Sequence, residues 1–158
     1  SKAVNLADYL PLDSFEHVAT GPFTHLYPKK GYTETAYKIL KTVPHISVYR
    51  KGELPERLHF GSSPRIGELV LLADLGTQIF FNPQGIPADF LRAGHGFDNK
   101  HPEMYAVFKA VGPDFKAGRH LSAPIPNITL YPLVCKILGI TPGEHDADES
   151  LAETLIKR

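Results

Sequence analysis

The densest group of side chains able to do chemistry lies between Gly94 and Glu103, in the run Gly-His-Gly-Phe-Asp-Asn-Lys-His-Pro-Glu. Histidines and carboxylates are the side chains that hold zinc or act as general acids and bases. The glycines on either side of His95 let the backbone approach a ligand closely. The spacing of His95 and His101 matches no zinc-finger, His-Glu-x-x-His or EF-hand pattern, so the alternative of a solvated turn stays open.

Other catalytic motifs are missing from the sequence or have a plainer explanation. It contains no Gly-x-Gly-x-x-Gly dinucleotide loop, no Gly-x-x-x-x-Gly-Lys-Ser/Thr phosphate loop and no Gly-x-Ser-x-Gly elbow. Arg50, Arg57 and Arg65 could line an anion site, but exposed strand and turn positions explain them more simply. Cys135 lies in an apolar run, which predicts a buried small hydrophobe rather than a nucleophile.

The composition excludes several classes of protein. The 158 residues include 17 Lys and Arg, 17 Asp and Glu and eight His, so the formal net charge at pH 7 is zero. Such a chain offers no general basic surface to a nucleic-acid backbone or an anionic membrane. Its longest apolar runs are far shorter than the roughly 20 residues that span a bilayer. With a single Cys, no internal disulfide can form.

The elements that would position the Gly94–Glu103 loop are predicted from hydrophobic periodicity. A helix is expected over residues 32–42, where apolar side chains recur at helical spacing and Thr33 can act as the N-cap. The last two of the predicted strands should pair as a hairpin across the turn at 74–76. Together these elements predict a two-layer α+β arrangement, one face of a sheet being covered by one helix. The predicted strands are residues 15–20, 23–27, 45–50, 68–73 and 77–81.

The character of the sequence changes after Pro83. Residues 85–102 show no clear period, and loops of that length in compact domains are commonly functional. The chain is therefore divided near residue 82 into an α+β subdomain and a segment of loops and helices. In that segment we expect a short buried strand or turn over 104–111, a helix over 128–138 capped by Asn127, and a polar helix over 148–156.

Several stretches resemble the nucleotide pyrophosphatase/phosphodiesterase family of the alkaline phosphatase superfamily. They are His45–Phe60 with the Pro-Arg-Ile-Gly that comes after it, the Gly-His-Gly-Phe-Asp-Asn segment with its His-Pro-Glu-Met continuation, and Gly-Pro-Asp-Phe-Lys. The similarity extends over nearly the whole chain. It implies the C-terminal part of an alkaline-phosphatase-like α/β fold that carries a two-layer α+β insertion subdomain. Residues 1–12 and 83–158 would then belong to the catalytic domain, and residues 13–82 would form the insertion.

The resemblance implies a zinc-dependent hydrolase of phosphodiester or pyrophosphate bonds. Members of the family use a Thr or Ser nucleophile at a two-zinc centre, where the metals activate the nucleophile and neutralise the phosphoryl oxygens. The histidine of the His-Gly-Phe-Asp-Asn motif is a zinc ligand in the family, and this role falls on His95. Asp98 and Asn99 would orient that ligand or fix its loop. The substrate would be a nucleotide or another phosphodiester.

The sequence departs from the family pattern in one respect. The nucleophile, the Asp-His-Gly segment and the remaining metal ligands have no counterpart here, and Val4–Leu10 resembles the stretch shortly downstream of that segment in the family. We therefore expect a C-terminal fragment that has no catalytic nucleophile and is inactive alone. We also expect it to hold no zinc stably, because one histidine is too few ligands. A non-catalytic α+β module that binds a ligand or a partner protein is the alternative.

The compartment is also inferred from the resemblance. Enzymes of this family work mostly outside the cytoplasm. Animal members are rich in disulfides, whereas this chain has one Cys. The expectation is therefore a periplasmic or secreted protein of bacterial origin.

Overall fold

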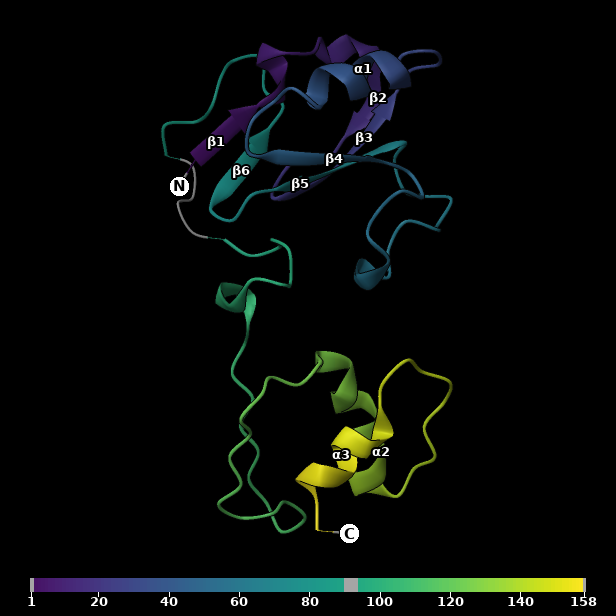
Figure 1. The fold of residues 1–158 in the computed structure, drawn as a ribbon, viewed down its shortest axis with the longest axis vertical. Coiled ribbons are helices and arrows are strands. Elements are labelled where there is room, and N and C mark those ends of the chain that lie inside the picture. The colour runs from purple at the N-terminus through teal and green to yellow at the C-terminus, as the bar shows by residue number, and fades with distance from the viewer. Residues whose placement is uncertain (1, 90–93, 158) are drawn as a thin grey trace. The chain divides into compact units, whose positions relative to one another are not determined.

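The computed structural model describes residues 2–89 and 94–157. The chain divides into two compact units, Ser1–Met104 and Tyr105–Arg158 (Figure 1). Each unit has a hydrophobic core of its own. Within the described ranges, no helix combines the length and the apolar character needed to cross a membrane.

The first unit is built on a four-stranded antiparallel sheet with the strand order β2-β3-β5-β4. The central strand β5 pairs with β3 on one side and with β4 on the other. All five residues of β5 are buried, so both faces of the sheet are covered at its centre. The strand bounds are Phe15–Val18 for β2, Phe23–Pro28 for β3, Ile46–Arg50 for β4 and Leu69–Ala73 for β5.

Helix α1 (Thr33–Leu40) covers one face of this sheet. Ala36 and Leu40 lie one turn apart on the helix, and both are fully buried in the cluster that contains Leu69 and Leu71 of β5. The predicted helix, strands and two-layer α+β arrangement are therefore confirmed. The predicted cap is wrong, since the N-cap residue is Tyr32 and its side chain makes no capping hydrogen bond.

The predicted hairpin at 68–81 is also wrong. Strand β6 (Thr77–Phe80) pairs in parallel with β1 (Lys2–Asn5), and these two strands form a second sheet. The turn itself is present, because the backbone N–H of Thr77 donates to the carbonyl of Asp74 at 2.9 Å. It carries the chain from one sheet to the other. Two apolar strands joined by a short turn are typical of a hairpin. The strand that takes the place of β5 beside β6 is β1, which lies more than 70 residues earlier in the chain.

Asn5 joins the ends of β1 and β6. Its side chain is almost completely buried, with Nδ2 donating to the carbonyl of Asn82 and Oδ1 accepting from the N–H of Asn82, both at 3.0 Å. Oδ1 also accepts from the N–H of Ala7 at 3.3 Å, which caps the 3-10 turn Leu6–Asp8. One amide side chain therefore satisfies backbone groups of both segments that come after the parallel strands.

The second unit contains two helices, α2 (Leu130–Leu138) and α3 (Glu149–Leu155). Its core is formed by Leu133 of α2 with Ala152, Leu155 and Ile156 at the C-terminal end. Helix α2 ends as predicted at Gly139, whose φ is +68°. Cys135 is buried, as the sequence predicts.

Two details of this half differ from expectation. Residues 105–111 form no strand, and Val107 is 95% exposed. Asn127 does not cap the helix, because it opens a 3-10 turn whose N-cap residue is Pro126 and which has no side-chain capping bond. The strand was predicted from apolar residues alone and the cap from the residue type alone. Neither property shows which contacts the segment makes in the folded chain.

Candidate metal-ligand loop

The Gly94–Asn99 loop is held by contacts on either side of His95. A side-chain carbon at Gly94 would lie 3.1 Å from Nε2 of Gln78, so the loop begins close to β6. Gly96 has a φ of +91°, a conformation that residues with a Cβ rarely adopt. Phe97 is half-buried and packs against the core of the first unit. His95 therefore lies between Gly94, which runs close to β6, and Phe97, which anchors the loop on the core.

A second anchor is the ion pair between Asp98 and Arg57. Nη1 of Arg57 donates to Oδ1 of Asp98 at 2.8 Å and Nη2 donates to Oδ2 at 2.5 Å, so both carboxylate oxygens are engaged. Nη1 also lies 3.3 Å from Oδ1 of Asn99, to which it donates. Oδ1 of Asp98 accepts in addition from the backbone N–H of Lys100 at 3.0 Å. Paired planar groups of this kind combine strength with a fixed geometry.

The electrostatics agree with this geometry. The Asp98 side chain is 9% exposed. The hydrogen bonds from Arg57, together with the Lys100 N–H and the nearby positive charges, lower the pKa of the Asp98 carboxyl to about 2 although burial opposes the shift. Hydrogen bonding to Asp98 in turn raises the pKa of the Arg57 guanidinium. Both groups are therefore fully charged at neutral pH.

Arg57 reaches Asp98 from the segment that connects β4 to β5. It lies in the 3-10 turn Glu56–Leu58, which comes after Pro55 and ends at His59 in a left-handed conformation. The two partners are 41 residues apart in the chain. From the sequence, Arg57 was only one of three arginines expected to be exposed, and this role was missed because no local pattern indicates a partner so far away.

The structure does not bring the three arginines together as an anion site. Arg50 donates to both carboxylate oxygens of Glu34 at 2.8 Å and lies over the ring of Tyr37. Arg57 is occupied by Asp98. At Arg65, the backbone carbonyl accepts a hydrogen bond from the hydroxyl of Tyr27. The plainer interpretation of these residues is therefore the better one.

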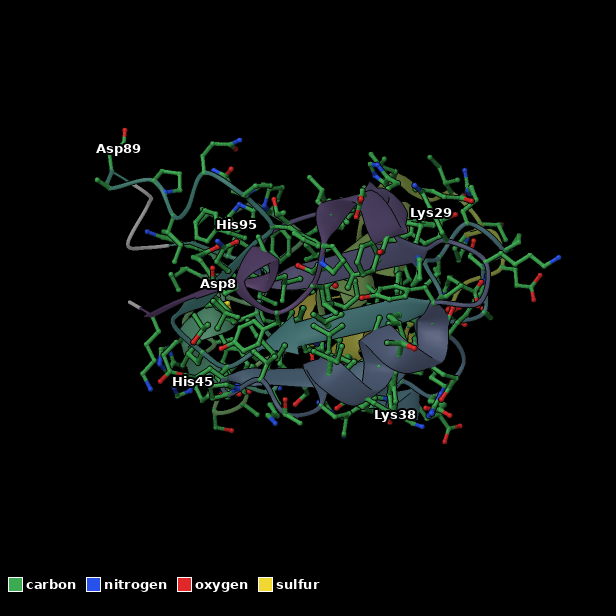
Figure 2. The ribbon with its side chains drawn as sticks, turned by 90° about the horizontal axis from the view of Figure 1, so that it is seen from above. Asp8, Lys29, Lys38, His45, Asp89 and His95 are labelled. Atoms are coloured by element: carbon green, nitrogen blue, oxygen red, sulfur yellow. The ribbon has the colours of Figure 1, made fainter. Side chains whose placement is uncertain are left out.

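His95 itself is exposed. Figure 2 shows it on the same side of the first unit as Asp8, with Lys29 and Lys38 toward the opposite end. Across residues 2–89 and 94–157, no group of three or more His, Cys, Asp or Glu side chains could hold a metal ion, so His95 does not form such a group with His101 and Glu103. An exposed imidazole can donate one lone pair to a metal, which fits one ligand position of a zinc ion and no more.

The family comparison matches residues 1–98 to the model for type I phosphodiesterase/nucleotide pyrophosphatase. Among curated proteins, human ectonucleotide pyrophosphatase/phosphodiesterase family member 7 is 39% identical over 133 residues, which cover 84% of this chain and 28% of that protein. Human bis(5'-adenosyl)-triphosphatase is 30% identical over 145 residues, covering 92% of this chain and 31% of that protein. The chain thus spans about a third of the length of these relatives.

The fold is similar to that of solved structures. Human ectonucleotide pyrophosphatase/phosphodiesterase 5 superposes with a TM-score of 0.92 and 31% identity, covering 99% of this chain and 41% of that one. An inactive variant of the murine protein in complex with AMP gives a TM-score of 0.91 at 30% identity, with the same coverage. These relatives are mammalian, so they give no support to the expected bacterial origin.

Proposed function

Because the chain belongs to the type I phosphodiesterase/nucleotide pyrophosphatase family, we propose that it is the C-terminal part of a zinc-dependent enzyme that hydrolyses phosphodiester or pyrophosphate bonds. It adopts part of the alkaline-phosphatase-like fold that the resemblance implied. The observation that carries the proposal is His95, an exposed imidazole held by Gly96, Phe97 and Asp98 in the motif that the resemblance assigns to a zinc ligand.

In this proposal His95 supplies one ligand to a zinc ion. Two bound zinc ions activate the nucleophile and neutralise charge on the phosphoryl oxygens in such a centre. This chain's own part is to present the imidazole, while Asp98 and Asn99 fix the loop through Arg57. Of the two roles expected for Asp98, the fixing of the loop is the one that its hydrogen bonds support.

We propose that the chain is inactive by itself and holds no zinc stably. A zinc site needs three or four converging ligands, and the described residues contain no such group. The sequence contains no recognisable counterpart of the family's nucleophile. Residues 1–12 and 83–158 would belong to the catalytic domain, and residues 13–82, which contain the whole four-stranded sheet and α1, would form the insertion.

The substrate class proposed for the whole enzyme is a nucleotide or another phosphodiester. Support comes from the murine family member 5 that was solved with AMP and from the relative named bis(5'-adenosyl)-triphosphatase. Several relatives are named ectonucleotide pyrophosphatases, which supports a site of action outside the cytoplasm.

The test is substitution of His95 in the complete enzyme that contains this chain. Turnover of a p-nitrophenyl phosphodiester with zinc should fall tenfold or more in His95→Ala, since the loss of a metal ligand costs at least as much as the loss of its supporting groups. His120→Ala, a change at an exposed histidine of the second unit, is the matched control and should keep activity within about twofold.

Three results would overturn the proposal. Activity of His95→Ala within twofold of the unsubstituted enzyme would rule out the ligand role. Turnover by the isolated chain that survives His95→Ala would show that the chain carries a different active centre. Binding of a ligand or partner without turnover in the complete protein would favour the non-catalytic module instead.

A further inference from the structure

We propose that Arg57 is the positioning residue for the His95 loop, so that the segment between β4 and β5 sets where the His95 imidazole lies. The proposal concerns a residue to which neither the family resemblance nor the sequence pattern gives a role. It rests on the proposed function, because the importance of the loop depends on His95 being a zinc ligand. The contact that carries it is the two-oxygen pairing of Arg57 with Asp98, reinforced at Asn99.

Burial makes this contact decisive for the loop. Asp98 is half-buried as a residue and its side chain is 9% exposed, and a carboxylate with so little access to water depends on being paired and hydrogen-bonded. Without Arg57, the hydrogen-bond donor that remains to the carboxylate among the described residues is the backbone N–H of Lys100. The ammonium of Lys100 lies 3.8 Å from Oδ2, and its side chain is 60% exposed. At that distance and exposure the ammonium cannot replace a guanidinium that engages both oxygens.

The loss of this pairing would reach His95 through a short stretch of backbone. Between His95 and Asp98 lie Gly96, in a left-handed conformation, and Phe97, which packs on the core. If Asp98 moves outward to recover water, the turn at Gly96 loses its ion-paired anchor and keeps, among the described residues, the packing of Phe97 on that side. The imidazole would then sample several positions, and a metal site requires its ligands to be held closely to one.

Arg50 offers a matched control. Like Arg57, it makes a two-oxygen pairing with a carboxylate in the first unit, in this case Glu34 of α1. Its partners Glu34, Glu53 and Tyr37 all lie outside the 94–99 loop. Arg50→Ala therefore removes the same kind of interaction without touching the loop.

The first measurement uses the chain itself and needs no zinc. Hydrogen exchange of the Lys100 amide, which donates to Asp98, should accelerate by about tenfold or more in Arg57→Ala, while the amides of β5 keep their protection. Arg57→Lys should give an intermediate rate, because a lysine restores the charge but not the two-oxygen geometry. Arg50→Ala should leave the Lys100 amide unchanged. Equal rates in the Arg57→Ala and unsubstituted chains would overturn the proposal.

The second measurement uses the complete enzyme and determines the zinc dissociation constant by competition with a chelator. We expect Arg57→Ala to weaken zinc binding by about tenfold, with a smaller loss in Arg57→Lys and none in Arg50→Ala. If Arg57→Ala accelerates exchange of the Lys100 amide but leaves the zinc dissociation constant unchanged, then Arg57 does not position His95. If His95→Ala also left the zinc affinity unchanged, the proposed function would fall, and the exchange data would still report whether Arg57 orders the loop.

Discussion

Replacement of Asn5 by alanine tests whether one side chain holds the two parallel strands together at their ends. The substitution removes two hydrogen bonds of 3.0 Å to Asn82, one of 3.3 Å to Ala7 and a longer one of 3.4 Å to Oδ1 of Asp8. The N–H groups of Asn82 and Ala7 then lose this acceptor, whereas the Asn82 carbonyl keeps its hydrogen bond from the N–H of Gly85 at 3.0 Å. Each unpartnered buried backbone group costs about 1–3 kcal/mol, and Asn82 is only half-buried, so water recovers part of this. The expected loss is about 2–4 kcal/mol.

The assay is amide hydrogen exchange at β1, β6 and Asn82, because a chain with two units need not unfold in a single transition. A loss of about 2–4 kcal/mol should speed exchange there by about 30-fold to several hundred-fold, at about 1.4 kcal/mol for each factor of ten. Asn82→Ala is the matched control. It removes one turn bond, from the Gln84 N–H to Oδ1, and leaves the backbone pairing with Asn5 intact.

The control should therefore lose less than about 1 kcal/mol. If Asn5→Ala and Asn82→Ala accelerate exchange of the β1 and β6 amides equally, the reasoning is refuted. The side chain of Asn5 would then contribute no more than an ordinary turn residue, in spite of its burial and its bonds to both strand ends.

Two other predictions concern the ion pair and the second core. The pKa of Asp98 is lowered to about 2, so the pairing is fully present above about pH 4 and is lost as the pH falls toward 2. Because the Arg57 side chain is 43% exposed, water screens the pairing and the effect of its loss is modest. Protection of the Lys100 amide, corrected for intrinsic exchange, should fall about fivefold in that window, and an equal pH dependence in Asp98→Asn would contradict this. The side chain of Leu133 is 2% exposed, so Leu133→Ala should lower the free energy of unfolding of the second unit by about 2–4 kcal/mol. Hydrogen exchange at the α2 and α3 amides measures this loss. The control is Val134→Ala, at a side chain that is 51% exposed, and it should lower that free energy by less than about 1 kcal/mol. Similar losses in both variants would refute the assignment of the core.

Local patterns predicted most of the elements but not how they pair. Helix α1 and strands β4 and β5 follow from the spacing of apolar residues within each segment, and the structure confirms all three. The pairing of β6 with β1 could not be found in this way, because the turn at 74–76 satisfies every local rule for a hairpin. Which partner a strand takes is decided by segments far away in the chain.

The candidate site shows the same division. The glycines around His95 and the polar residues after it identify the loop from its sequence alone. The role of Arg57 cannot be predicted from the local sequence, since its partner Asp98 lies 41 residues further on. Arginines in turns are also common on protein surfaces. In residues 105–111 the sequence predicted too much rather than too little. Val107 and Val111 suggest a buried strand, yet both side chains are largely exposed.

The pairing of β1 with β6 also constrains the order in which the first unit can fold. These strands close a loop made of residues 6–76, which contains the whole four-stranded sheet and α1. Closing so long a loop while it is disordered costs considerable chain entropy, whereas a folded insert brings its two ends together in advance. We therefore expect the antiparallel sheet and α1 to form first, and β1 to dock on β6 late. The kinetic consequence expected of a compact subdomain placed between two neighbouring parallel strands is slow docking of β1 that is limited by the topology.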